Sequence, residues 1–123
     1  MNNIFFVFLG GGIGSLVRYG ISEIVKGNFK SSFPIATLCA NIISCLVLAL
    51  TVGYFSDKLA GNSSLRTLVL IGFCGGLSTF STFSYETVEL MRSGNIGMAV
   101  LNVLISVTVC LCIIYYLTKT TTA

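Results

Sequence analysis

GGLSTFSTFSYE, residues 75–86, is the stretch that decides how this chain folds. It places two glycines, six hydroxyl-bearing side chains, two phenylalanines and one carboxylate inside a segment that is otherwise hydrophobic enough to lie in a membrane. A hydroxyl without a hydrogen-bond partner is costly in hydrocarbon. Such a cluster is therefore expected either to hold helices together or to line a path for something polar.

The composition around this stretch predicts an all-α integral membrane protein. Hydrophobic residues make up 54% of the chain, charged residues 9%, and the mean hydropathy is +0.94, so there are too few charges to cover a soluble globule. Each apolar block is near the roughly 20 residues that a helix needs to cross a bilayer. The predicted spans are about residues 4–25, 33–55, 68–91 and 96–117. The links between them are too short for another module, which predicts a single four-helix membrane domain over residues 1–123.

The titratable residues argue against an enzyme. The chain has no histidine, and its four acids do not form a ligand cluster. All five cysteines fall inside predicted spans, without the loop-located spacing of a disulfide framework, and are interpreted as packing residues. They are Cys39, Cys45, Cys74, Cys110 and Cys112.

The basic residues of the loops are balanced between the two sides of the membrane. If the four helices cross in succession, three fall on each side: Lys58, Arg66 and Lys119 on one, and Lys26, Lys30 and Arg92 on the other. The positive-inside rule orients a protein by its excess of Lys and Arg, so this tie predicts insertion in both orientations. Dual topology suits an antiparallel homodimer. The alternative is chance balance in a chain with few charges.

Glycines in the first span predict close helix packing. Gly10 and Gly14 form a GxxxG pattern, which lets membrane helices approach closely. A dinucleotide fingerprint is excluded, because Ser15 stands where its last glycine should be and no βαβ context surrounds it. Arg18, near the end of the span, either snorkels to the interface or makes one end of an internal vestibule positive.

The second and fourth spans each carry a weakly polar stripe at helical spacing. The stripes are Thr37, Asn41 and Cys45 in the second span, and Asn102, Ser106 and Cys110 in the fourth. Such stripes face protein or water rather than lipid. The Asn41 amide either makes an interhelical hydrogen bond or lines a pore.

The third span is expected to break between Gly75 and Thr79, where glycines meet a run of Ser and Thr. A break frees carbonyl oxygens, and two copies meeting on a dimer axis could enclose one monovalent cation. Beyond the break, Phe80 and Phe83 share a helix face. Their rings either pack normally or turn positive edges toward a small anion.

These residues together resemble a known family. GFCGGLSTFSTFSYE at residues 72–86, GGGIGSLVRY at residues 10–19, Asn41 in the second span, four spans and balanced loops are similar to the small bacterial fluoride channels of the Fluc (CrcB) family. The resemblance covers essentially the whole chain, and the GGxSTFSTFS run is its most specific part.

The resemblance implies a function and a set of site residues. It implies a dual-topology antiparallel homodimer in the bacterial inner membrane, with two pores that passively export fluoride from the cytoplasm and thereby lower its toxicity. By position, the fluoride pore would be lined by Asn41, Phe80, Phe83, Ser81, Thr82, Thr37 and Ser106. Backbone carbonyls of Gly75 and Ser78 would hold a structural sodium ion at the dimer centre, and Arg18 would lie in the vestibule. Glu86, Asn102 and Cys110 would lie beside the pore, with roles that the resemblance leaves open.

Two other classes of protein share some of these features. A small multidrug exporter also has four short helices, but it needs an acid embedded in its first span, where this chain has only Glu23 near the end, and usually an aromatic cage, whereas this chain has no tryptophan. A structural or assembly subunit would explain the glycines and the hydroxyls. It gives no reason for a helix break followed by paired phenylalanines.

Overall fold

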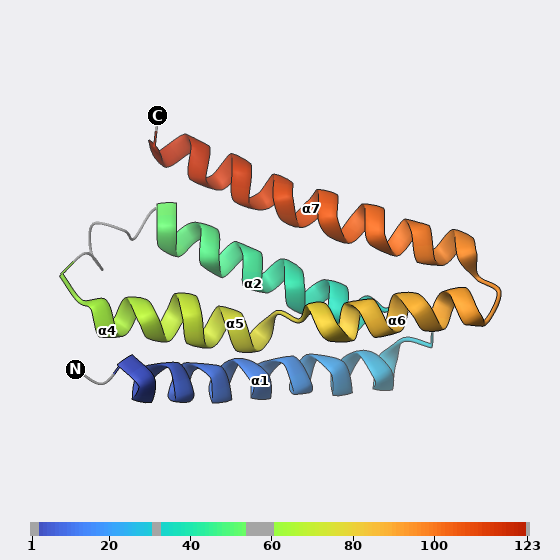
Figure 1. The fold of residues 1–123 in the computed structure, drawn as a ribbon, viewed down its shortest axis with the longest axis horizontal. Coiled ribbons are helices and arrows are strands. Elements are labelled where there is room, and N and C mark those ends of the chain that lie inside the picture. The colour runs from blue at the N-terminus through green and yellow to red at the C-terminus, as the bar shows by residue number, and fades with distance from the viewer. Residues whose placement is uncertain (1–2, 31–32, 54–60, 123) are drawn as a thin grey trace.

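Four helical segments lie side by side in the computed structural model, which describes residues 3–30, 33–53 and 61–122 (Figure 1). The first two are α1 (Asn3–Asn28) and α2 (Ile35–Gly53), and the last is α7 (Ile96–Thr122). The third is composite: α4 (Ser63–Arg66), a π-helical segment η1 (Thr67–Phe73), α5 (Cys74–Leu77) and α6 (Phe80–Arg92). Four stretches are long and apolar enough to cross a membrane, namely Asn3–Asn28, Ile35–Gly53, Ser63–Arg92 and Ile96–Lys119. The all-α membrane fold is thus confirmed.

Local hydrogen bonds explain where several helices begin and end. α1 continues to Asn28, whose Nδ2 donates to the Ile24 carbonyl at 2.8 Å. α4 begins after Asn62, whose Oδ1 accepts from the Leu65 N–H at 3.0 Å and so caps the first turn. α2 ends at Gly53, and the last two residues of the predicted second span, together with Lys58, lie outside the described residues.

The predicted break in the third span is present between α5 and α6. Ser78 (φ −79°, ψ 157°) and Thr79 (φ −153°, ψ 123°) are extended, and the ribbon loses its coil between the two helices (Figure 1). Thr79 then caps α6, because its side-chain oxygen accepts from the Thr82 N–H at 3.2 Å. The chain therefore restarts a helix immediately after two residues of extended backbone.

Glycines let α1 lie directly against the first half of the broken span. A Cβ added to Gly72 would stand 2.9 Å from the Gly10 Cα, and one added to Gly76 would collide with the Gly11 backbone. A Cβ at Gly14 would collide with the Phe73 carbonyl oxygen. The GxxxG prediction for α1 is therefore confirmed, and Gly72 with Gly76 supplies the facing small surface.

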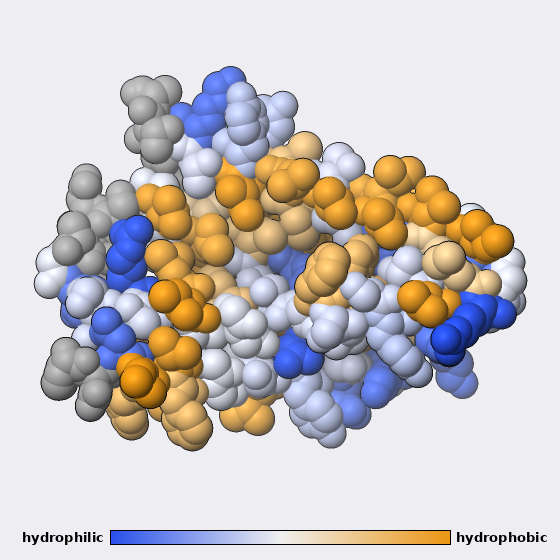
Figure 2. Space-filling model, viewed as in Figure 1, coloured by the Kyte–Doolittle hydropathy of each residue, from blue (hydrophilic) through white to orange (hydrophobic). Residues whose placement is uncertain are grey.

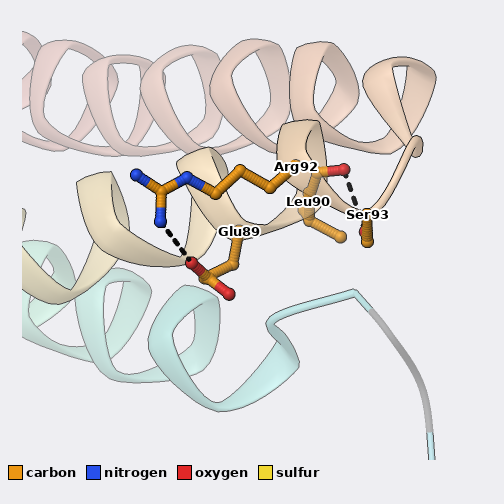
Figure 3. Close-up of polar contacts among 4 residues, drawn as sticks. All are labelled: Glu89, Leu90, Arg92 and Ser93. Atoms are coloured by element: carbon orange, nitrogen blue, oxygen red, sulfur yellow. Dashed lines mark hydrogen bonds and ion pairs between the residues drawn. The ribbon is translucent and has the colours of Figure 1, made fainter.

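A tight turn returns the chain from α6 to α7 (Figure 3). The Ser93 hydroxyl donates to the Leu90 carbonyl at 3.0 Å, and Gly94 has φ 89°, a value that favours glycine. Arg92 and Glu89 form an ion pair at 3.5 Å. Because these side chains are 75% and 48% exposed, the pair contributes at most about 1 kcal/mol. The turn sets α7 antiparallel to α6.

Many large apolar side chains are exposed on the outer surface, as the membrane assignment requires. Figure 2 shows hydrophobic side chains over much of one face, with less hydrophobic residues near its centre. The described basic residues at the helix ends fall into two groups, one at each end of the helix bundle, as the sequence predicted. Arg66 in α4 and Lys119 in the last turn of α7 lie at the end where α1 begins, and Lys26 and Arg92 lie at the opposite end (Figure 1).

Candidate functional site

The helix break is held by the side-chain amide of Asn41 on α2. Asn41 Oδ1 accepts from the Thr79 N–H at 2.8 Å, and Asn41 Nδ2 lies 3.4 Å from the Thr79 carbonyl oxygen. In a continuous helix the Thr79 N–H would reach the Gly75 carbonyl instead. The interhelical hydrogen bond predicted for Asn41 is confirmed. It is made to half-buried backbone at the break.

Serine hydroxyls satisfy the carbonyl just before the break. The Cys74 carbonyl accepts from the Ser78 N–H at 3.0 Å, from the Ser78 hydroxyl at 2.8 Å and from the Ser44 hydroxyl at 2.9 Å. Ser44 is buried on α2, so this contact also ties α2 to α5. The sequence did not indicate this role for Ser44.

Arg18 turns toward the break rather than toward the membrane surface. Its Nε donates to the Gly76 carbonyl at 3.1 Å, across from α1 to α5. This contact and the place of Arg18 in the lining of a cavity favour the vestibule interpretation over snorkelling. A charge-assisted hydrogen bond to a carbonyl freed by the break explains why the guanidinium is drawn inward.

A cavity of about 310 Å³ opens beside the break, between α2, α6 and α7. Its walls combine polar groups from α2, α7 and the break with apolar side chains from α6 and α7. They are Asn41, Cys45, Ser78, Thr79, Phe80, Phe83, Ser106, Val107, Cys110 and Leu111. Asn41, Phe80, Phe83 and Ser106, four of the residues assigned by the resemblance to a pore, thus meet at one site.

The two phenylalanines lie side by side in this wall. Their ring centroids are 5.7 Å apart with planes tilted by 39°. Phe83 is 8% exposed and Phe80 is 77% exposed. Of these two phenylalanines, only Phe83 packs in the interior of its own chain. Burial within the chain therefore does not account for a phenylalanine at position 80.

A second cavity, of about 150 Å³, lies on the other side of the break. It is lined by Arg18, Tyr19, Ser22, Ala36, Thr37, Thr79, Thr82 and Glu86. Thr79 lines both cavities, so the extended residues of the break separate one from the other. Sequence reasoning used Thr79 only to bound the break and did not assign it to the site.

Glu86 faces the smaller cavity together with Arg18. Its Oε1 atom is buried, and no described residue gives it a hydrogen bond. The carboxylate is therefore not turned away from the site. A carboxyl group therefore shares this small space with the guanidinium of Arg18.

Asn102 is buried between α6 and α7 and holds a residue of the cavity wall in place. It is 1% exposed, its Nδ2 donates to Thr87 Oγ1 at 3.0 Å, and its Oδ1 accepts from the Ser106 hydroxyl at 3.3 Å. This bridge joins α6 to α7 and orients Ser106 in the cavity wall. The sequence analysis did not predict a role for Thr87. Its hydroxyl also donates to the Phe83 carbonyl at 2.8 Å. The spacing of one helical turn between Thr87 and Phe83 is the signal that could have indicated this contact.

Two further predicted site residues, Ser81 and Gly75, lie near the break and are both exposed. Ser81 is exposed, its hydroxyl lies 3.5 Å from that of Thr79, and it lines neither of the two cavities described above. Gly75 is also exposed, and a Cβ added there would meet nothing within 4 Å. No described contact within the single chain therefore requires a glycine at position 75.

Comparison with known proteins identifies the family. The family model described as "CrcB-like protein, Camphor Resistance (CrcB)" matches residues 5–117. The chain belongs to the CrcB family. The resemblance noted in the sequence is therefore confirmed.

Relatives in the CrcB family are similar over most of their length. A protein of Coxiella burnetii (strain CbuK_Q154) is 43% identical over 110 residues, covering 89% of each chain. One of Aquifex aeolicus (strain VF5) is 44% identical over 94 residues, covering 76% of each chain. One of Shewanella halifaxensis (strain HAW-EB4) is 39% identical over 117 residues, covering 94% of this chain and 92% of the relative. Each carries the name "Fluoride-specific ion channel FluC". This chain is accordingly a multi-pass membrane protein of a channel family and not an enzyme.

Proposed function

We propose that this chain is a fluoride-selective ion channel that exports fluoride from the cytoplasm passively. The observation that carries the proposal is the helix break itself. In a chain whose relatives are named fluoride-specific channels, the break brings Asn41, Thr79 and two phenylalanines to the wall of one cavity.

The groups at the break suit a small, strongly hydrated anion. The Asn41 Nδ2 has two hydrogens, and the Thr79 carbonyl accepts at most one of them, which leaves the other for a fluoride ion in the larger cavity. Positive ring edges of Phe80 and Phe83 add weak attraction without a fixed charge that would trap the ion.

The two cavities suggest the route. A fluoride ion would enter the smaller cavity, where Arg18 supplies positive charge, pass Thr82 and Thr37, and cross Thr79 into the larger cavity beside Ser106. A cell-negative potential drives an anion outward, at roughly 2.3 kcal/mol per charge for each 100 mV. Such transport needs no other energy source.

A second copy of the chain would complete each pore. Phe80 is 77% exposed in the single chain, although it stands in the cavity wall beside Asn41. In an antiparallel homodimer, whose two-fold axis lies in the membrane plane, each copy would cover this face of the other. The two covered faces would form two pores. The balance of basic residues between the two ends supports insertion in both orientations.

The backbone of the break supports a structural sodium ion at the centre of the proposed dimer. The Thr79 N–H is taken by Asn41, so the Gly75 carbonyl loses its usual helical donor, and Ser78 is in extended backbone. Carbonyl oxygens are ligands that suit a hard cation. Gly75 and Ser78 of each copy would hold the ion through these oxygens, and its role would be to fix the two breaks against each other.

The test is fluoride efflux from liposomes that contain the purified protein. We expect rapid loss of trapped fluoride when a potassium ionophore balances the charge, and no comparable loss of chloride. Protein-free liposomes are the control. Equal efflux of the two halides, or none of either from a correctly folded dimer, would contradict the proposal.

A further inference from the structure

Two thiols meet in the wall of the larger cavity, one turn beyond the groups assigned to the pore. Cys45 follows Asn41 by four residues on α2, and Cys110 follows Ser106 by four residues on α7. Helical spacing places each cysteine on the same face as its polar neighbour. The thiols of Cys45 and Cys110 are neighbours on adjacent helices, and both line the cavity.

This pair differs from the other cysteines of the chain. Cys74 is buried, and its thiol donates to the Ser44 carbonyl. Cys39 and Cys112 lie on the same two helices as the pair, but neither lines the larger cavity. Packing, the role expected from the sequence, explains the buried Cys74, but it gives no reason for two thiols in the lining of one cavity.

We propose that Cys45 and Cys110 form a binding site for a soft, thiophilic metal ion that favours two-coordinate, linear geometry, and that the bound ion obstructs the passage. Sulfur ligands select soft cations over hard ones. Among the described residues lining this cavity, none carries a carboxylate, so a hard divalent ion would find no charged oxygen ligand there. Zinc would lack two of its four usual ligands.

The binding step balances as a proton exchange. With Hg²⁺ as the probe, two S–H bonds break, two S–Hg bonds form, and two protons leave to water, with no change of oxidation state. The product is neutral, because two thiolates cancel the charge of the ion. A neutral complex is the form that a largely apolar cavity tolerates best.

The obstruction of the passage rests on the proposed function, whereas the metal site itself does not. The experiment therefore has two readouts. The first is intact mass spectrometry of the chain after titration with Hg²⁺, which distinguishes a chain that exchanged two hydrogens for one mercury from a chain capped on a single thiol. The second is fluoride efflux from liposomes, before and after mercury.

Two double variants are compared, and each replaces one cysteine on α2 and one on α7. Cys45→Ser with Cys110→Ser removes the pair, and Cys39→Ser with Cys112→Ser removes one cysteine from each of the same helices. We expect the two-hydrogen adduct in the unmodified protein and in the second variant. Removing the pair should raise the half-saturating mercury concentration by roughly 100-fold or more, because the second thiol binds intramolecularly.

Efflux is compared with each protein's own rate before mercury. Mercury should block the unmodified protein and the Cys39/Cys112 variant alike, and should leave the rate of the pair variant unchanged. Equal formation of the two-hydrogen adduct in both variants would overturn the site. An adduct at Cys45 and Cys110 with undiminished efflux would overturn the obstruction. If the unmodified protein carries no fluoride at all, the proposed function fails while the mass readout still decides the site.

Discussion

Asn41 shows how one side chain can serve both the fold and the passage. Its oxygen accepts the Thr79 N–H, while its nitrogen faces the Thr79 carbonyl and lines the larger cavity. Asn41→Asp keeps the acceptor, removes both amide hydrogens and introduces a negative charge at the path. We expect fluoride efflux to be abolished. Asn41→Ala should in addition leave the Thr79 N–H unpaired and lower stability by about 1–3 kcal/mol.

Thermal unfolding in detergent, measured beside efflux, separates the two effects. A variant that stays as stable as the unmodified protein but conducts no fluoride supports the role in the passage. Asn41→Asp with normal efflux would contradict it.

Phe80 and Phe83 allow packing to be separated from conduction, because their burial differs so strongly, at 77% and 8% exposed. Isoleucine keeps bulk and apolarity but lacks a positive ring edge. We expect both Phe80→Ile and Phe83→Ile to lower efflux sharply. Only Phe83→Ile should change the stability of the single chain, by at most about 1.5 kcal/mol. Near-normal efflux in both variants would remove the phenylalanines from the proposed pore.

At the scale of the element, the broken third span carries two kinds of glycine. Gly76 lies against the α1 backbone, so Gly76→Ala should displace α1 and reduce the yield of folded protein. Gly75 has open space around it within the chain. Gly75→Val should therefore leave the chain helical while weakening the proposed dimer. Size-exclusion chromatography in detergent distinguishes the two, and an unchanged dimer in Gly75→Val would contradict a contact at the break.

The proposed sodium site lies in the same broken span and can be tested there. Because the Cys74 carbonyl keeps two other donors, Ser78→Ala should leave the break and its backbone oxygens nearly intact. Replacing sodium by a large organic cation throughout purification should instead reduce efflux or dimer stability in both proteins. Full activity after exhaustive removal of sodium would argue against a structural ion.

At the scale of the whole molecule, the equal number of basic residues at the two ends should control orientation. Lys26→Gln with Lys30→Gln leaves an excess on one side, so we expect a single orientation and loss of efflux. Lys26→Gln with Arg66→Gln removes one charge from each end and should preserve both orientations and efflux. C-terminal reporter fusions measure the orientation. A single orientation with full efflux in the unmodified protein would contradict the antiparallel arrangement.

Hydropathy alone determined the fold class and the approximate limits of the four spans, because a helix that crosses hydrocarbon needs a minimum length of apolar residues. The same local logic located the break, where glycines precede a run of hydroxyl side chains at residues 75–79. The Gly10 and Gly14 packing face was also readable from spacing. Each of these features depends on residues that are neighbours in the sequence.

Partners that are distant in the sequence were decided only by the tertiary structure. Asn41 is 38 residues from Thr79, and Arg18 is 58 residues from Gly76, yet both bind the break. A freed carbonyl or N–H in a membrane protein must find a donor or acceptor on a neighbouring helix. Which helix supplies that partner depends on how the helices are placed against one another, and no local pattern records that placement.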